Sequence, residues 1–175
     1  WLTVDTDDLR HTPSSQGHPT RSKGTAHEGT SPEMKLAMKS FREWLDRTQV
    51  SLTRFVIADQ LDDGYFATWL KDLLENHDQV TIACHGLTHK CWSAYPKDEE
   101  GFLAALIEAD VKLHKFAKDA WRPWFRAPAG YIAPWMAPII AKAGFELDSS
   151  VNPSWIVRKK AGPWKDWNAI LSCNY

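Results

Sequence analysis

The sequence predicts an α/β fold, a distorted parallel (β/α) barrel that is incomplete at its carboxyl end. Two observations favour this class: short apolar runs alternate with segments of helical periodicity, and polar side chains follow the ends of the apolar runs. Parallel strands joined by helices place their carboxyl ends on one face, where a site can assemble. We therefore expect the functional residues at that face.

Short runs rich in β-branched and aromatic residues are predicted strands. They cover residues 2–4, 54–58, 80–84, 124–125, 145–147 and 169–173. The sequence begins in one such run, without an initiator Met, and ends shortly after another. We therefore expect further elements of the fold to lie beyond both ends of the sequence.

Four segments with apolar residues at helical spacing are predicted helices. The first begins with Ser31 as its N-cap and Pro32 at the first helical position. The second carries an apolar stripe over residues 66–74, and the third opens with the acidic run 98–100, which complements the helix dipole. The fourth ends at Gly144, a common C-terminal stop.

The chain is predicted to form one domain over residues 1–175. Its 175 residues, of which 43% are hydrophobic, are enough for one core and too few for two. A polar stretch at about 10–30 breaks the rhythm of strands and helices. Loops of this length are usually lids or disordered, and this one follows the first predicted strand, so we expect it to lie over the site.

Charge and hydropathy exclude two kinds of partner. The net charge is -1 and the basic residues are dispersed, so no nucleic-acid partner is expected. No run approaches the roughly 18 apolar residues that cross a bilayer, so no membrane span is expected. Cys84, Cys91 and Cys173 are too few for a disulfide framework and favour a reducing compartment such as the cytoplasm. The location and the formation of a homo-oligomer stay open.

Two polar clusters follow the first and third predicted strands. Asp5 and Asp7 are two residues apart, and His85 and His89 are four apart. In an extended strand the two carboxylates share a face, so one can bind a metal while the other stays free as a base. Two imidazoles and one carboxylate leave coordination positions open, which is typical of a catalytic metal site. The pattern predicts a divalent-metal hydrolase site.

Each cluster also has a structural interpretation. Aspartates after a strand often cap a turn, and many histidine pairs only form hydrogen bonds. Cys84 and Cys91 flank the histidines and could complete a closed zinc site, but Cys84 should point away from the face that His85 uses. The loop histidines are expected to be solvated: His11, His18 and His27.

These motifs resemble those of polysaccharide deacetylases of the NodB-homology type, carbohydrate esterase family four, in a divergent branch. Residues 2–7 resemble the first motif, with one residue inserted between its aspartates, and residues 85–89 resemble the second. The resemblance implies that Asp5 is the catalytic base. It implies a divalent-metal cofactor, in the first place Zn²⁺, held by Asp7, His85 and His89.

A third match covers residues 125–130. It implies that Arg126 pairs with the base and that the Ala129 backbone N–H faces the developing oxyanion. A match after the fifth predicted strand implies that Asp148 orients the arginine. The family's general acid is a late histidine, and no His follows His114 in this sequence. Either the sequence stops before that residue or the protein has lost it.

The resemblance implies an enzyme that removes N-acetyl groups from an amino sugar or glycan, which would be its partner. Divergent branches with the inserted residue include hydrolases of non-sugar amides or imides, and the sequence does not separate the two. A third interpretation is a non-catalytic glycan-binding or assembly protein that retains the fold. The missing acid supports it, and the intact set of metal and base residues opposes it.

Overall fold

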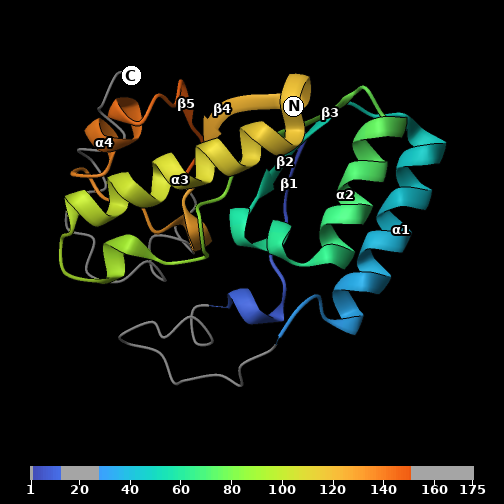
Figure 1. Cartoon of the computed structure of the whole chain (residues 1–175), viewed down its shortest axis with the longest axis horizontal. Coiled ribbons are helices and arrows are strands. Elements are labelled where there is room, and N and C mark those ends of the chain that lie inside the picture. The colour runs from blue at the N-terminus through green and yellow to red at the C-terminus, as the bar shows by residue number, and fades with distance from the viewer. Residues whose placement is uncertain (1, 13–27, 151–175) are drawn as a thin grey trace.

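The structure, a computed structural model, describes residues 2–12 and 28–150 and contains a sheet of parallel strands. The strands are β1 (Leu2–Asp5), β2 (Leu52–Val56), β3 (Val80–Cys84), β4 (Trp121–Phe125) and β5 (Leu147–Asp148). Each strand pairs in parallel with the next one along the chain. The strands curl into a half-barrel with helices between them (Figure 1), which confirms the predicted distorted, incomplete barrel.

The main helices are α1 (Pro32–Thr48), α2 (Gly64–Asn76), α3 (Glu99–Ala117) and α4 (Ala137–Lys142). The predicted start of α1 is confirmed, because the Ser31 hydroxyl accepts a hydrogen bond from the Met34 N–H. Asp98 caps α3 in the same way through the Gly101 N–H. Within the described residues, no helix has the length and apolar character that crossing a bilayer requires.

Short 3₁₀ turns follow the carboxyl ends of most strands. These are η1 (Leu9–His11), η2 (Ala58–Asp62), η3 (Trp92–Ala94) and η5 (Pro128–Gly130), while η4 (Lys118–Ala120) precedes β4. In Figure 1, η1 lies at the lower end of the half-barrel, where β1 ends. The polar stretch predicted as a long loop is described only at its two ends, since residues 13–27 lie outside the described residues.

Strand β2 covers Leu52–Val56 rather than the predicted 54–58, so Arg54 lies in its middle and not at its start. The Arg54 guanidinium packs over the rings of Phe41 in α1 and Trp69 in α2, at 4.4 and 4.9 Å from their centroids. Burial lowers the pKa of Arg54 to about 10, although the charge of Asp5 opposes the shift. A charged residue thus occupies the sheet–helix interface, which the sequence pattern did not predict.

Among the remaining strands, only β3 has the predicted bounds, and β1 extends one residue further, to Asp5. Residues 80–84 were predicted correctly, β4 extends back to Trp121, and β5 covers Leu147–Asp148 rather than 145–147. The predicted strand at 169–173 lies outside the described residues.

The main core lies between the sheet and the helices. Leu52, Val56 and Ile82 pack there against Leu45 of α1 and Leu70 of α2. The other face of the strands carries polar groups, including the hydroxyls of Thr53 and Thr81, which lie 2.9 Å apart. The helices therefore cover the outer face and leave polar side chains on the inner face of the half-barrel.

Candidate metal centre

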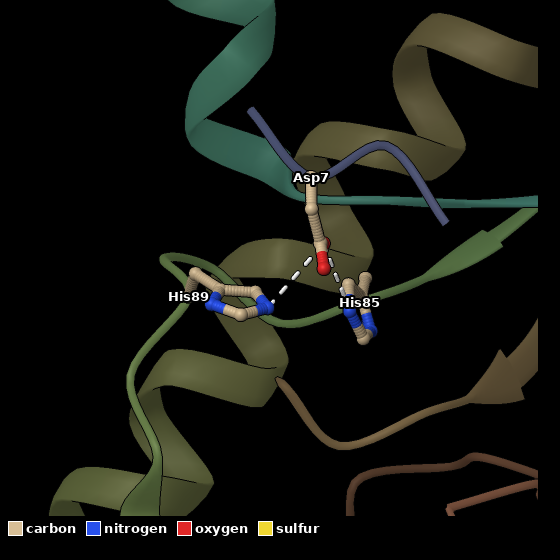
Figure 2. A group of neighbouring side chains, drawn as sticks. All are labelled: Asp7, His85 and His89. Atoms are coloured by element: carbon tan, nitrogen blue, oxygen red, sulfur yellow. Dashed lines mark ion pairs between the residues drawn. The ribbon is translucent and has the colours of Figure 1, made fainter. Parts of the chain in front are cut away.

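Two loops, at the carboxyl ends of β1 and β3 on either side of β2, bring three potential ligands together. Oδ1 of Asp7, after β1, lies 3.3 Å from Nε2 of His85 and 3.3 Å from Nε2 of His89, both after β3 (Figure 2). One ligand atom from each residue lies within 4.8 Å of the others. Ligands about 2.0–2.2 Å from a tetrahedral metal are roughly 3.3–3.6 Å apart. These three side chains could therefore hold one metal ion.

The free nitrogens of the histidines support this interpretation. Nε2 of His85 and Nε2 of His89 are buried and have no hydrogen-bond partner among the described residues. Nδ1 of His85 lies 2.8 Å from the carbonyl oxygen of Arg126. A carbonyl can only accept, so this nitrogen carries the proton and Nε2 presents its lone pair toward Asp7. This is the arrangement of a histidine that binds a metal.

Asp7 supplies negative charge to this cluster. Burial alone would raise the pKa of its carboxyl group, but the neighbouring imidazoles of His85 and His89 hold that pKa well below its usual range. The Asp7 side chain is 47% exposed, whereas the two histidine side chains are buried. The cluster is therefore anchored inside the protein and open on its carboxylate side.

The inserted Thr6 separates the two aspartates. Strand β1 ends at Asp5, and Thr6 is fully buried between it and Asp7. Nε2 of Gln60 donates to the Thr6 carbonyl at 2.6 Å, and the Thr6 hydroxyl also contacts the Gln60 side-chain oxygen. The Thr6 N–H donates to the Phe55 carbonyl at 3.2 Å. These hydrogen bonds fix the chain after Asp5 to η2 and to β2. Asp5 and Asp7, on either side of Thr6, therefore contact different partners.

Asp5 pairs with Arg126, as the sequence predicted. Nη1 of Arg126 donates to Oδ1 of Asp5 at 2.6 Å, and Nη2 donates to the Thr3 hydroxyl at 2.9 Å. Nε donates to the Ser149 hydroxyl at 3.1 Å, and the guanidinium lies 4.0 Å from the ring centroid of Phe55. The arginine is thereby held in one orientation beside the metal cluster.

Asp148 was expected to help orient Arg126, and this role stays a prediction, since no hydrogen bond or ion pair joins the two side chains among the described residues. Oδ1 of Asp148 accepts from the Ser150 N–H at 2.9 Å and from the Ser150 hydroxyl. Ser149 takes the place next to the arginine that was assigned to Asp148. The physical reason is alternation, since neighbouring residues at the end of an extended strand face opposite sides. Burial raises the pKa of Asp148, although its hydrogen bonds with Ser150 oppose the shift.

Ala129 lies in η5, in the turn that follows Arg126. It adopts a left-handed backbone conformation, with φ 52° and ψ 18°, which is uncommon for a residue with a side chain. The turn is held by the Ala127 N–H, which donates to the Ser150 hydroxyl at 2.7 Å. Ala129 is an exposed residue on a fixed turn, and the role of its amide toward an oxyanion stays a proposal.

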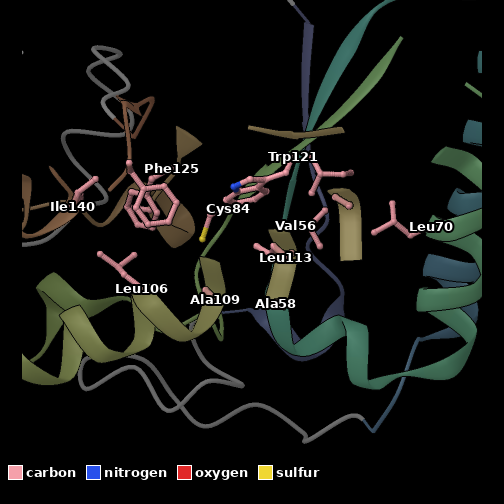
Figure 3. Packing of buried hydrophobic residues seen from close by; sticks show 14 of the residues in the cluster. Val56, Ala58, Leu70, Cys84, Leu106, Ala109, Leu113, Trp121, Phe125 and Ile140 are labelled. Atoms are coloured by element: carbon pink, nitrogen blue, oxygen red, sulfur yellow. The ribbon is translucent and has the colours of Figure 1, made fainter. Parts of the chain in front are cut away.

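Among the described residues, Cys84 and Cys91 take no part in the cluster, and Cys173 lies outside these residues. Cys84 lies in the hydrophobic core (Figure 3), which confirms that it points away from the histidines. Burial raises the pKa of Cys84 to about 12, and burial together with the charge of Asp7 raises that of Cys91 to about 12. Neither sulfur belongs to the group of converging ligand atoms, which Asp7, His85 and His89 form, so these two cysteines do not complete a closed zinc site.

His11 was expected to be solvated, but it is buried beside the cluster. Its ring centroid lies 5.9 Å from that of His89, and its Nδ1 accepts the Asp8 N–H at 3.0 Å. The available signal was the spacing of Asp8 and His11, which form the reciprocal cap of η1. His18 and His27 lie outside the described residues.

Comparison with known proteins shows a structural likeness. No family model and no curated protein sequence matches this chain. The fold is similar to the crystal structure of a Mycobacterium smegmatis protein provisionally assigned as a polysaccharide deacetylase, with a TM-score of 0.62 and 20% identity. The match covers 86% of this chain and 50% of that protein, so this chain spans half of its length. The likeness shows a shared fold.

Proposed function

We propose that this protein is a metal-dependent hydrolase that removes N-acetyl groups from an amino sugar or glycan. The observation that carries the proposal is the convergence of Asp7, His85 and His89 beside a separate carboxylate, Asp5, which Arg126 holds. The shared fold with a protein provisionally assigned as a polysaccharide deacetylase favours this substrate class over other hydrolase substrates.

Zn²⁺ is the cofactor that this donor set suits best. Two imidazoles and one carboxylate are typical of catalytic zinc sites, and other mid-series divalent metals accept the same ligands. When bound, the metal would acidify a water molecule and polarise the acyl carbonyl group. Because only three protein ligands converge among the described residues, positions remain for the water and the substrate.

Asp5 is the group that we assign as general base. Its carboxylate is 35% exposed and is therefore accessible to water. Arg126 fixes the orientation of this carboxylate through the 2.6 Å hydrogen bond. The Ala129 N–H is the assigned donor to the oxyanion. The leaving amine also needs a proton, which the resemblance gives to a late histidine that this sequence lacks.

The direct test is acetate release from acetylated chito-oligosaccharides and peptidoglycan fragments. We expect release by the Zn²⁺-loaded protein, loss of release with a chelator, and recovery when Zn²⁺ is added back. Asp5→Asn should keep its metal and lose about 10²-fold or more of the rate, because general base catalysis typically contributes about that much. Asp62→Asn is the matched control, since Asp62 is exposed and pairs with Lys112.

Two outcomes would replace the proposal. Hydrolysis of simple amides or imides, with no acetate released from sugars, would keep the metal site and change the substrate. Binding of acetylated sugars without any release by the metal-loaded protein would indicate a glycan-binding protein that retains the fold.

A further inference from the structure

His11 lies between the two loops that carry the candidate metal ligands. It ends η1, four residues after Asp7, and its side chain is buried. Nδ1 accepts the N–H of Asp8, the residue next to that ligand, at 3.0 Å. The ring also packs against His89, with centroids 5.9 Å apart and planes tilted by 50°. One side chain thus contacts both ligand-bearing segments.

The second ring nitrogen of His11, Nε2, lies near the carboxylate of Asp59. Nε2 of His11 lies 3.7 Å from Oδ1 of Asp59, and neither atom has a hydrogen-bond partner among the described residues. Because Nδ1 accepts a backbone N–H, a neutral ring carries its proton on Nε2, directed at this carboxylate. The Asp59 N–H donates to the Leu87 carbonyl at 2.9 Å, two residues before His89. Asp59 therefore contacts both His11 and the loop that carries His89.

The two histidine ligands differ in how they are oriented. His85 is fixed from behind, because its Nδ1 lies 2.8 Å from the Arg126 carbonyl oxygen. Nδ1 of His89 is buried and has no hydrogen-bond partner among the described residues. Metal-binding histidines almost always receive support on the nitrogen that does not bind the metal. The packing of the His11 ring is the contact that can replace such support for His89.

We propose that His11 is a positioning residue of the metal centre. It couples the Asp7 segment to the His89 ring and, backed by Asp59, keeps Nε2 of His89 directed at Asp7. The inference rests on the proposed function, because it presumes that these residues hold a metal. His11 is 1% exposed, so it acts through His89 and does not touch substrate.

Metal affinity of the full chain tests this role. His11→Asn keeps an acceptor near the position of Nδ1 for the Asp8 N–H and removes the ring that packs on His89. We expect it to bind Zn²⁺ about tenfold or more weakly in competition with a chelator, the usual effect of removing a supporting residue. His11→Phe keeps a ring of similar size and should lose less affinity. The Co²⁺ absorption spectrum should change in His11→Asn, since it reports ligand geometry.

His77→Asn is the matched control. His77 is also buried, and its Nε2 lies 2.9 Å from Asp46 on α1, outside the metal cluster. This variant should melt at a lower temperature and bind Zn²⁺ and Co²⁺ as the wild type does. Should His11→Asn not fold, Asp59→Asn provides the second test, with the same expected direction.

The outcomes separate the two proposals. A wild-type protein that binds neither Zn²⁺ nor Co²⁺ would remove the metal centre itself. If the wild type binds metal, wild-type affinity and an unchanged Co²⁺ spectrum in His11→Asn would overturn the positioning role. An equal loss of affinity in His77→Asn would also overturn it, because the effect would then follow from stability alone.

Discussion

Arg126 donates a hydrogen bond from Nη1 to Oδ1 of Asp5 across 2.6 Å, although the two residues are 121 positions apart in the chain. The same guanidinium reaches Thr3 on β1 and Ser149 after β5. A planar guanidinium with several fixed partners holds a carboxylate in one orientation. The ends of strands β1, β4 and β5 are therefore tied together at the assigned base.

Removing this arginine should separate metal binding from chemistry. Arg126→Met keeps similar length and loses the charge and the hydrogen bonds to Asp5. We expect the variant to keep its metal and to lose about 10²-fold in kcat/KM, because a misplaced catalytic group typically costs that much. Metal content and acetate release would both be measured.

Arg122→Met is the control, since Arg122 lies on the same strand and donates to the carbonyls of Asp119 and Trp121. Undiminished activity in Arg126→Met would show that the ion pair with Asp5 has no part in the reaction.

Asp148 should make stability depend on pH. Burial raises its pKa above the ordinary 3.8, so the folded state holds the proton more tightly than the unfolded state. Its stabilising contribution is complete below pH 3.8 and is lost as the pH rises through the folded-state pKa. Asp148→Asn keeps an acceptor for Ser150 and should remove this loss, so the variant should gain stability relative to the wild type as the pH rises.

Free energies of unfolding from urea titrations at several values between pH 3 and 7 would show this difference as a gap that widens with pH, following the sign of the linkage relation. A constant difference across the range would mean that Asp148 does not titrate differently in the two states.

Gly86, in the histidine loop, should not tolerate a side chain. Its φ is +92°, and an added Cβ would lie 2.8 Å from the Thr88 carbonyl oxygen. Gly144 has the same φ with nothing within 4 Å, so Gly144→Ala measures the backbone strain alone, about 1–2 kcal/mol. We expect Gly86→Ala to cost more than Gly144→Ala in free energy of unfolding and to weaken metal binding.

Gly64→Ala is the neutral reference for this pair, because Gly64 begins α2 and has nothing within 4 Å of an added Cβ. Equal costs for Gly86→Ala and Gly144→Ala would show that the loop relieves the contact with Thr88 at no cost.

Local sequence signals predicted most of the fold. The apolar run of β3 and the cap of α1 at Ser31 depend on neighbouring residues alone, and both have the predicted positions. The burial of Arg54 within β2 could not be predicted in this way. Arg54 is compatible with a buried strand only because Phe41 and Trp69, which come from two different helices, cover its guanidinium.

The features of the candidate site also fall into those that local sequence signals predict and those that they do not. The ligand cluster follows from strand ends that meet on one face, so motif spacing was sufficient to predict it. The Asp5–Arg126 pair was expected only from the family resemblance. The burial of His11 and the contact of Ser149 with Arg126 depend on residues distant in sequence. The sequence of a polar loop does not show which of its side chains a loop distant in sequence will bury.

Metal analysis of the purified protein tests the central claim most directly. We expect about one Zn²⁺, or another mid-series divalent ion, per chain in wild-type protein purified without chelator. His89→Ala should lose this metal, whereas His114→Ala, an exposed histidine stacked on Trp121, should retain it. Equal metal content in wild type and His89→Ala would contradict the assignment of Asp7, His85 and His89 as the metal centre.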